Sequence, residues 1–249
     1  FQVKKFFGRI NLIFLEIPNV FEGFKINLLD KRFAKKNTFI SLGTNCYFRM
    51  ILSKYGLKAR RKDGELSYPF DLVKTQIDSV LNFLKTDFED FFENIEYSEA
   101  DKIFIDRKYH SLFSHDKFKS SEKGLFINRY IKRINNFKNL FKQNNRLLFC
   151  SVIFDDFIDA DVINQIYDNL KRMEKQSTFD YCVMHLVKND NSYSVKGGAK
   201  INENIHYIKM NVPIDNYSDV WHLGTYRKLP QVMEFEANFV NEIYNFYNS

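Results

Sequence analysis

The sequence predicts a single three-layer α/β domain in which a mostly parallel central sheet lies between two layers of helices. Near-continuous apolar runs at 146–154 and 180–187 are typical of strands that are buried on both faces of a sheet. Amphipathic helical segments at 126–143 and 160–175 precede these runs, and this alternation favours parallel strands joined by helical crossovers. With 249 residues, of which 45% are hydrophobic and 27% charged, the chain is long enough to bury a sizeable core.

Residues 1–37 are predicted to form a basic, amphipathic extension or linker ahead of the α/β domain at 38–249. Basic residues such as Lys4 and Arg9 are interspersed with apolar ones, and Pro18 ends the apolar run. We expect this segment either to pack against the main domain or to contact a membrane surface. The chain opens with phenylalanine rather than methionine, which suggests a piece of a longer protein.

A cysteine stands where the first predicted strand passes into the first predicted helix. Residues 38–41 have a strand pattern, Gly43 supplies a turn, and apolar residues recur at helical spacing from Phe48 to Tyr55. The N–H groups and positive dipole of a helix N-terminus lower the pKa of a thiol, and open α/β sheets bind ligands at the carboxyl ends of their strands. Cys46 is therefore the candidate nucleophile.

Hydrophobic periodicity and turn residues place the remaining elements. The sequence predicts helices at 74–84 and 230–247, a short helical segment at 87–92, a strand at 204–210, and a β-hairpin or irregular excursion at 103–118. We find no internal repeat and no domain boundary after residue 37.

The charge balance favours anionic partners. Thirty-seven basic and 31 acidic residues give a net charge of +6 and a pI near 9.0, which suits phosphate groups, an anionic small molecule, an acidic polymer or a membrane surface. The basic runs at 31–36 and 58–62 lack the motif of a nucleic-acid module, so we expect no specific nucleic acid.

Three scattered cysteines suit neither a disulfide framework nor a metal site, so no metal is expected and the compartment is predicted to be reducing and cytoplasmic. The sequence has no apolar run of the ~20 residues that a bilayer-spanning helix needs. Cys150 and Cys182 lie within apolar strands, where we expect them to be buried. His185 and His206 are likewise expected to be core residues of their strands.

Several short blocks carry a resemblance to a known family. In order, they are Ser41-Leu-Gly-Thr-Asn-Cys46, Ser67-Tyr-Pro-Phe-Asp71, Phe113-Ser-His115-Asp116, Tyr130-Ile-Lys-Arg-Ile134 and Arg146-Leu-Leu-Phe149. They resemble a bacterial family of unknown function that is described as papain-like cysteine peptidases. The resemblance implies a nucleophile at Cys46 with His115 as its base.

The layout is also similar to SGNH-type esterases and to cysteine-dependent acetyltransferases of bacterial capsule synthesis, whose nucleophile follows the first strand. Those folds carry an Asp-x-x-His pair near the C-terminus, and this chain has Asp219 and His222. An aspartate three residues before a histidine can orient the imidazole, so His222 is the alternative base to His115. We expect at most one of the two histidines to act.

Three further residues are candidates for binding substrate or oxyanion. Asn45, or backbone N–H groups around Gly43 and Cys46, is placed to stabilise an oxyanion. Asp71 is expected either to join the substrate site or to cap the helix that follows it.

The favoured function is cysteine-dependent acyl transfer, in which a thiolate attacks a carbonyl. Water as acceptor would make the protein a hydrolase or peptidase, whereas a sugar hydroxyl would make it an acyltransferase acting on a bacterial surface polysaccharide. No cofactor is required, although a basic surface is compatible with coenzyme A as acyl donor. The non-enzymatic alternative is a domain that binds a glycan or a protein partner, located in the cytoplasm or at the inner face of the membrane.

Overall fold

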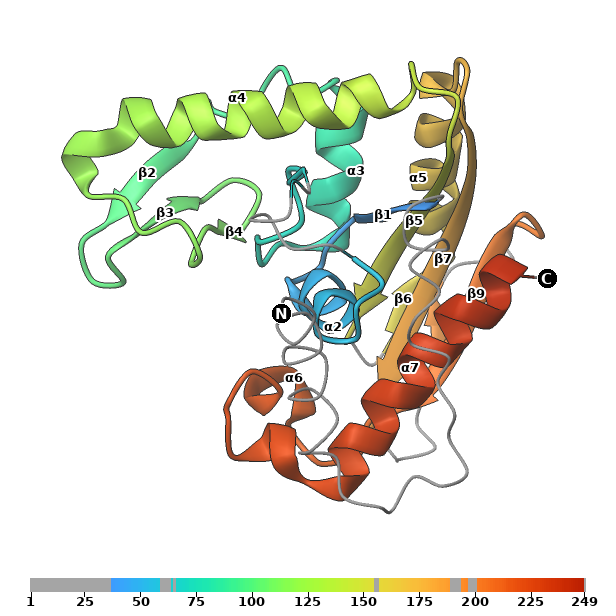
Figure 1. Cartoon of the computed structure of the whole chain (residues 1–249). Coiled ribbons are helices and arrows are strands. Elements are labelled where there is room, and N and C mark those ends of the chain that lie inside the picture. Colours follow the sequence, from blue (N-terminus) through green and yellow to red (C-terminus); the bar gives the residue numbers. More distant parts are fainter. Residues whose placement is uncertain are drawn as a thin grey trace, which may run out of the picture.

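The central sheet has four strands, and every neighbouring pair is parallel. The computed structural model describes residues 37–58, 64, 66–154, 157–188, 194–196 and 201–248 (Figure 1). The strands, in their order across the sheet, are β1 (Asn37–Ser41), β5 (Arg146–Ile153), β7 (Thr178–Val187) and β9 (Ile205–Asn211). The predicted α/β class with a mostly parallel sheet is confirmed, while the predicted N-terminal extension lies outside the described residues, apart from its last position.

The two inner strands are apolar because both of their faces are covered. In β5 every residue after Arg146 is buried, and the last seven residues of β7 are buried as well. Phe149 pairs with Tyr181, and Cys150 pairs with Cys182. Side chains alternate between the two faces of each strand, so these pairs belong to opposite sides of the sheet.

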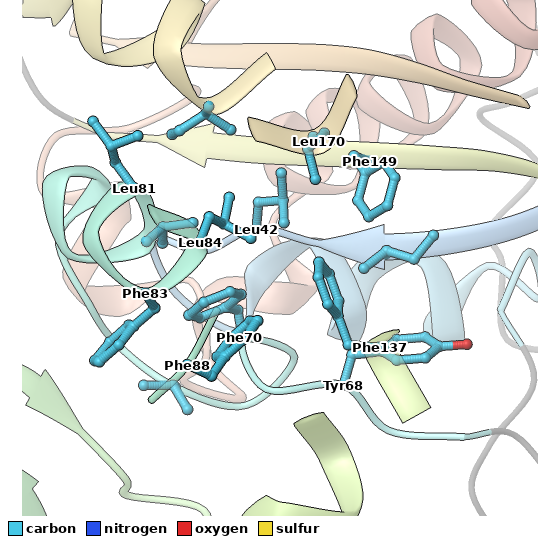
Figure 2. Close-up of a cluster of buried hydrophobic side chains, with 14 of the residues drawn as sticks. Leu42, Tyr68, Phe70, Leu81, Phe83, Leu84, Phe88, Phe137, Phe149 and Leu170 are labelled. Carbon is cyan, nitrogen blue, oxygen red and sulfur yellow. The ribbon is translucent and has the colours of Figure 1, made fainter. Parts of the chain in front are cut away.

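Helices cover both faces of this sheet. One face packs against α3 (Ile77–Lys85), α4 (Lys123–Leu140) and α5 (Ala160–Met173), and the other against α2 (Tyr47–Lys54), α6 (Tyr217–Val220) and α7 (Pro230–Asn248). Figure 2 shows the first core, which includes Phe70, Phe83, Phe88 and Leu42, the residue after β1. The three predicted layers are therefore present.

A small antiparallel sheet lies beside α4, away from the central sheet (Figure 1). Its strands are β2 (Ile95–Ser98), β3 (Ile103–Asp106) and β4 (Ser111–Leu112). Phe104 stacks on Phe126 of α4 with ring centroids 4.5 Å apart, which fixes the small sheet under that helix. The hairpin predicted within 103–118 is confirmed as β3 and β4, although β2 was not predicted.

Two predictions about the segment before this sheet are wrong. Residues 87–92 form turns rather than a helix, because Asp87 and Phe88 have positive φ angles of 50° and 65°. Helix α3 begins at Ile77 rather than at residue 74, because Lys74 and Thr75 are extended and pair with other segments.

Short elements complete the fold. Unpredicted strands β6 (Phe157–Asp159) and β8 (Ser194–Lys196) form a parallel pair, and single 3₁₀ turns occur at η3 (Ser120–Glu122) and η4 (Tyr226–Lys228). Within the described part of the chain, none of the helices has the length and apolar character needed to cross a membrane.

Candidate active site

The turn that carries the candidate nucleophile is held by the end of β5. Leu42 N–H donates to the carbonyl of Cys150 at 2.9 Å, and Thr44 N–H donates to that of Val152 at 3.0 Å. Val152 N–H in turn donates to the carbonyl of Gly43, also at 3.0 Å. The parallel pairing thus continues past the end of β1, so the turn emerges at the carboxyl edge of the sheet.

Gly43 makes this turn possible through its backbone. Its φ of +85° lies in the left-handed region that favours glycine, and an added Cβ would lie 3.3 Å from methyl groups of both Thr75 and Val80. Its N–H donates to Ser41 Oγ at 3.3 Å and its carbonyl is occupied by Val152. Gly43 therefore shapes the turn, and its N–H already has an acceptor in Ser41 rather than being free to bind an oxyanion.

Cys46 is the N-cap residue of α2, and its side chain is half-buried. Asn45 Oδ1 accepts a hydrogen bond from Tyr47 N–H at 2.8 Å, which satisfies one of the free donors of the first helical turn. The Tyr47 ring is fully buried against Trp221 and Phe239, with ring centroids 5.0 and 5.2 Å away. The residues on either side of Cys46 thus fix its position.

Of the two candidate histidines, the structure brings His115 to the cysteine. His115 Nε2 lies 3.1 Å from Cys46 Sγ, although the residues are 69 positions apart. His115 follows β4 in the loop that leads to α4, so the small sheet and the central sheet each supply one partner.

The neighbouring carboxylate anchors the loop that carries His115. Asp116 is 1% exposed, and its oxygens accept hydrogen bonds from Arg129 at 2.7 Å, Tyr130 at 2.7 Å and Arg133 at 2.9 and 3.2 Å. All three donors belong to α4. Burial raises the pKa of Asp116, but the charge of Arg133 and the donated hydrogen bonds outweigh burial and hold the pKa below its usual range.

The electrostatics favour a neutral thiol beside a neutral imidazole. Burial raises the pKa of Cys46 to about 11, and this outweighs the opposing effects of its own backbone N–H and the charge of Arg227. Burial also lowers the pKa of His115; Asp116 opposes this shift, whereas Arg133 and His222 add to it. The backbone N–H at the helix N-terminus does lower the thiol pKa, as the sequence predicts, but removal from water has the larger and opposite effect.

Asp219 and His222 do not form the predicted pair in which the aspartate orients the imidazole. Asp219 lies on α6 and His222 just after it; both are exposed, and no hydrogen bond or ion pair joins them. The charge of His222 lowers the pKa of His115, so His222 is near the site without contacting the thiol through a hydrogen bond. The charge of Arg227, in η4, likewise lowers the pKa of Cys46. No sequence motif marks Arg227 as a site residue.

Asp71 occupies a buried charge cluster beside α2. Its carboxylate accepts from Arg49 at 3.2 Å, from Lys58 at 3.5 Å and from Tyr68 N–H at 3.0 Å, and the residue has no exposed surface. The alternative prediction that Asp71 caps the next helix is wrong, because the N-cap of α3 is Gln76. These contacts tie α2 to the segment that precedes α3.

The remaining cysteines and histidines behave largely as predicted. Cys150 and Cys182 are fully buried, and His185 is buried with Nδ1 2.8 Å from the Tyr207 hydroxyl. His206 is only half-buried and stacks on Phe246 at 4.1 Å. No group of three or more His, Cys, Asp or Glu side chains within the described ranges is arranged to hold a metal ion.

A thiol and an imidazole in contact at the carboxyl edge of a parallel sheet define the class: an α/β protein with a cysteine–histidine pair. The chain belongs to the family described as "Putative papain-like cysteine peptidase (DUF1796)", which matches residues 37–191. The matched region contains both Cys46 and His115 and ends before Asp219 and His222. The resemblance stated from the sequence blocks is thereby confirmed.

A relative of this chain is of viral origin. "Uncharacterized protein R408" of Acanthamoeba polyphaga mimivirus is 29% identical over 171 residues, which cover 56% of this chain and 73% of the relative. This relative gives no support to the expectation of a bacterial family. No solved structure shows a significant match to the chain.

Proposed function

We propose that this protein is a cysteine hydrolase in which Cys46 is the nucleophile and His115 the general base. The observation that carries the proposal is the 3.1 Å separation of Cys46 Sγ and His115 Nε2, which is within hydrogen-bonding reach. The family description, a cysteine peptidase, supports the same chemistry.

The pKa directions define how the reaction starts. A raised pKa for Cys46 and a lowered pKa for His115 favour a protonated thiol and a neutral imidazole, so in the proposed reaction Sγ–H donates to Nε2. As sulfur attacks a carbonyl carbon, the Sγ–C bond forms, the thiol proton moves to Nε2, and the carbonyl electron pair moves onto oxygen. The imidazolium then gives this proton to the leaving group as its bond to the carbonyl carbon breaks.

Hydrolysis of the acyl-enzyme uses the same histidine in reverse. His115 Nε2 accepts a proton from water while the water oxygen attacks the thioester carbon. The Sγ–C bond then breaks, the proton returns to sulfur, and the acid product leaves. One imidazole therefore serves as base and acid in both halves of the reaction.

Asn45 is the side chain we propose as oxyanion donor. Its Oδ1 is occupied by Tyr47 N–H, which orients the amide, while Nδ2 has no acceptor among the described residues. A fixed amide donor beside a nucleophile is suited to stabilising negative charge on a tetrahedral intermediate.

The acceptor of the acyl group decides between a hydrolase and an acyltransferase. We favour water as acceptor, in keeping with the family description. Transfer to a polysaccharide hydroxyl, coenzyme A as acyl donor, and membrane contact through the N-terminal extension are narrower proposals that rest on the sequence alone. A glycan- or partner-binding role without catalysis is the competing function.

The direct experiment is trapping of the acyl-enzyme with p-nitrophenyl acetate. The proposal predicts a burst of p-nitrophenolate and an acetyl group on Cys46, located by peptide mass spectrometry. Cys46→Ala is expected to lose both signals, whereas Cys150→Ala, which removes a buried thiol, serves as the matched control. Turnover that survives in Cys46→Ala would refute the mechanism. Adding coenzyme A or a sugar alcohol as second acceptor separates acyltransferase from hydrolase.

A further inference from the structure

An arginine beside the candidate active site has a guanidinium group with unused donors. Arg227 is half-buried in η4, and its Nε donates to the carbonyl of Trp221 at 3.1 Å. Its guanidinium also lies over the Trp221 ring, 5.5 Å from the centroid. No carboxylate in the described part of the chain pairs with Arg227, and its two terminal nitrogens have no acceptor there. An arginine offers five donors, so most of its binding capacity is available to a ligand.

Buried aromatic side chains connect Arg227 to the residue next to Cys46. Trp221 is 4% exposed and packs edge-to-face on Tyr47, the residue after Cys46, at 5.0 Å. The Tyr47 hydroxyl is 3.0 Å from that of Tyr217, at the start of α6. This packing holds the segment from α6 to η4 against the first turn of α2. The charge of Arg227 accordingly acts on the Cys46 thiol, whose pKa it lowers.

The other charges that act on the cysteine–histidine pair do not cancel that of Arg227. Within the described part of the chain, Asp116 is the carboxylate that acts on His115, and two arginines of α4 already pair with it. Arg133 and His222 both lower the pKa of His115. Among the described residues, two arginines and one carboxylate act on the pair, and this balance favours an anionic ligand.

We propose that Arg227 binds an anionic group of the substrate, a carboxylate or a phosphate, next to the carbonyl that Cys46 attacks. This inference rests on the proposed function for the identity of the attacking atom and adds the substrate class. A planar guanidinium can donate two parallel hydrogen bonds to the oxygens of either a carboxylate or a phosphate. The basic character of the whole chain, +6, suits the approach of such a substrate.

Two alkylating reagents that differ mainly in charge test this inference without any substrate. Iodoacetate and iodoacetamide both form an Sγ–C bond with Cys46 as the C–I bond breaks and iodide leaves, while the thiol proton passes to His115. We expect the ratio of the iodoacetate rate to the iodoacetamide rate at Cys46 to fall about tenfold in Arg227→Gln, since one charge-assisted hydrogen bond is lost. Lys228→Gln removes the same charge from the neighbouring exposed residue and is the matched control, with the ratio unchanged.

The outcomes separate this inference from the proposed function. A ratio that is the same in Arg227→Gln and the wild-type protein overturns the role of Arg227, even if Cys46 remains reactive. An equal fall in Lys228→Gln also overturns it, because the effect would then be general surface charge. A Cys46 that reacts no faster than the buried cysteines would instead contradict the proposed function.

Protection experiments distinguish the two anions. Inorganic phosphate and succinate are each titrated against iodoacetamide labelling of Cys46 at constant ionic strength. The inference is supported if phosphate or succinate protects Cys46 from labelling and if this protection is lost in Arg227→Gln but retained in Lys228→Gln. The anion that protects then identifies the class of ligand. Protection that persists unchanged in Arg227→Gln contradicts the inference.

Discussion

His115 Nε2 lies 3.1 Å from Cys46 Sγ, and the pKa of each group is shifted in the direction that favours its neutral form. A preformed thiolate–imidazolium pair would need the opposite shifts. The contact therefore suits the proposed roles, in which His115 is the general base and Cys46 a protonated nucleophile.

This neutral pair predicts a specific dependence on pH. The pKa of His115 is lowered from 6.5, so its neutral, proton-accepting form persists above that value and is lost only in more acidic solution. Cys46 should ionise only as pH approaches about 11. The ultraviolet absorbance of the thiolate, taken as the difference between wild type and Cys46→Ala, should be absent near neutral pH. A full thiolate signal at neutral pH would show an ion pair instead.

Asp116→Asn should destabilise the protein because it leaves Arg133 buried without its counter-charge. We expect a loss of about 3 kcal/mol in the free energy of unfolding, measured with urea at neutral pH. The folded pKa of Asp116 is below its unfolded value, so its contribution is present above the unfolded pKa of ~3.9 and lost as pH falls through the folded pKa. The difference between variant and wild type should therefore shrink in acid.

Arg129→Ala is the control for this prediction. The Arg129 side chain is 36% exposed, so its ion pair with Asp116 should contribute less than about 1 kcal/mol. Equal losses for Asp116→Asn and Arg129→Ala would contradict the account of the buried cluster.

Gly43→Ala tests the turn that carries the cysteine. A Cβ at φ +85° is strained and would press on Thr75 and Val80, so we expect a loss of about 1–2 kcal/mol in unfolding free energy. The same substitution at Gly124, in the first turn of α4, meets no atom within 4 Å and should be neutral or stabilising by up to ~1 kcal/mol. Urea unfolding of both variants checks the opposite signs, and a neutral Gly43→Ala would argue against the strained turn.

Asn45→Asp separates helix capping from oxyanion binding. The aspartate keeps an oxygen for Tyr47 N–H but has no amide donor, so the fold should be retained. The rate constant kcat for p-nitrophenyl acetate is expected to fall about 10²-fold or more, as when an oxyanion donor is removed. Unchanged kcat would exclude Asn45 as the donor.

Sequence patterns predicted the parts of the fold that local residues determine. Strands such as β5 are buried on both faces, and this produces an apolar run that is visible without a structure. The strand-to-helix position of Cys46 followed from Gly43 and the helical spacing after it. The turn at Asp87 and Phe88 was missed because a phenylalanine rarely adopts positive φ, and no local signal marks it.

The partners of the nucleophile depend on tertiary structure. His115 and His222 were equally plausible from the sequence, since choosing between them requires knowing how the loop after β4 meets α2. Burial, which sets the pKa of Cys46, is also a property of the folded chain. Arg227 carries no motif, and the role proposed for it depends on its contact with Trp221 and on the packing of Trp221 against Tyr47.

The rate of Cys46 labelling by iodoacetamide in His115→Gln and His222→Gln tests the central claim most directly. Peptide mass spectrometry would follow each of the three cysteines separately near neutral pH. The account predicts that labelling of Cys46 falls about 10²-fold in His115→Gln and stays close to wild type in His222→Gln, because His115, and not His222, is within hydrogen-bonding reach of the thiol in the described structure. Unchanged labelling in His115→Gln, or a fall confined to His222→Gln, would contradict the assignment of His115 as the base.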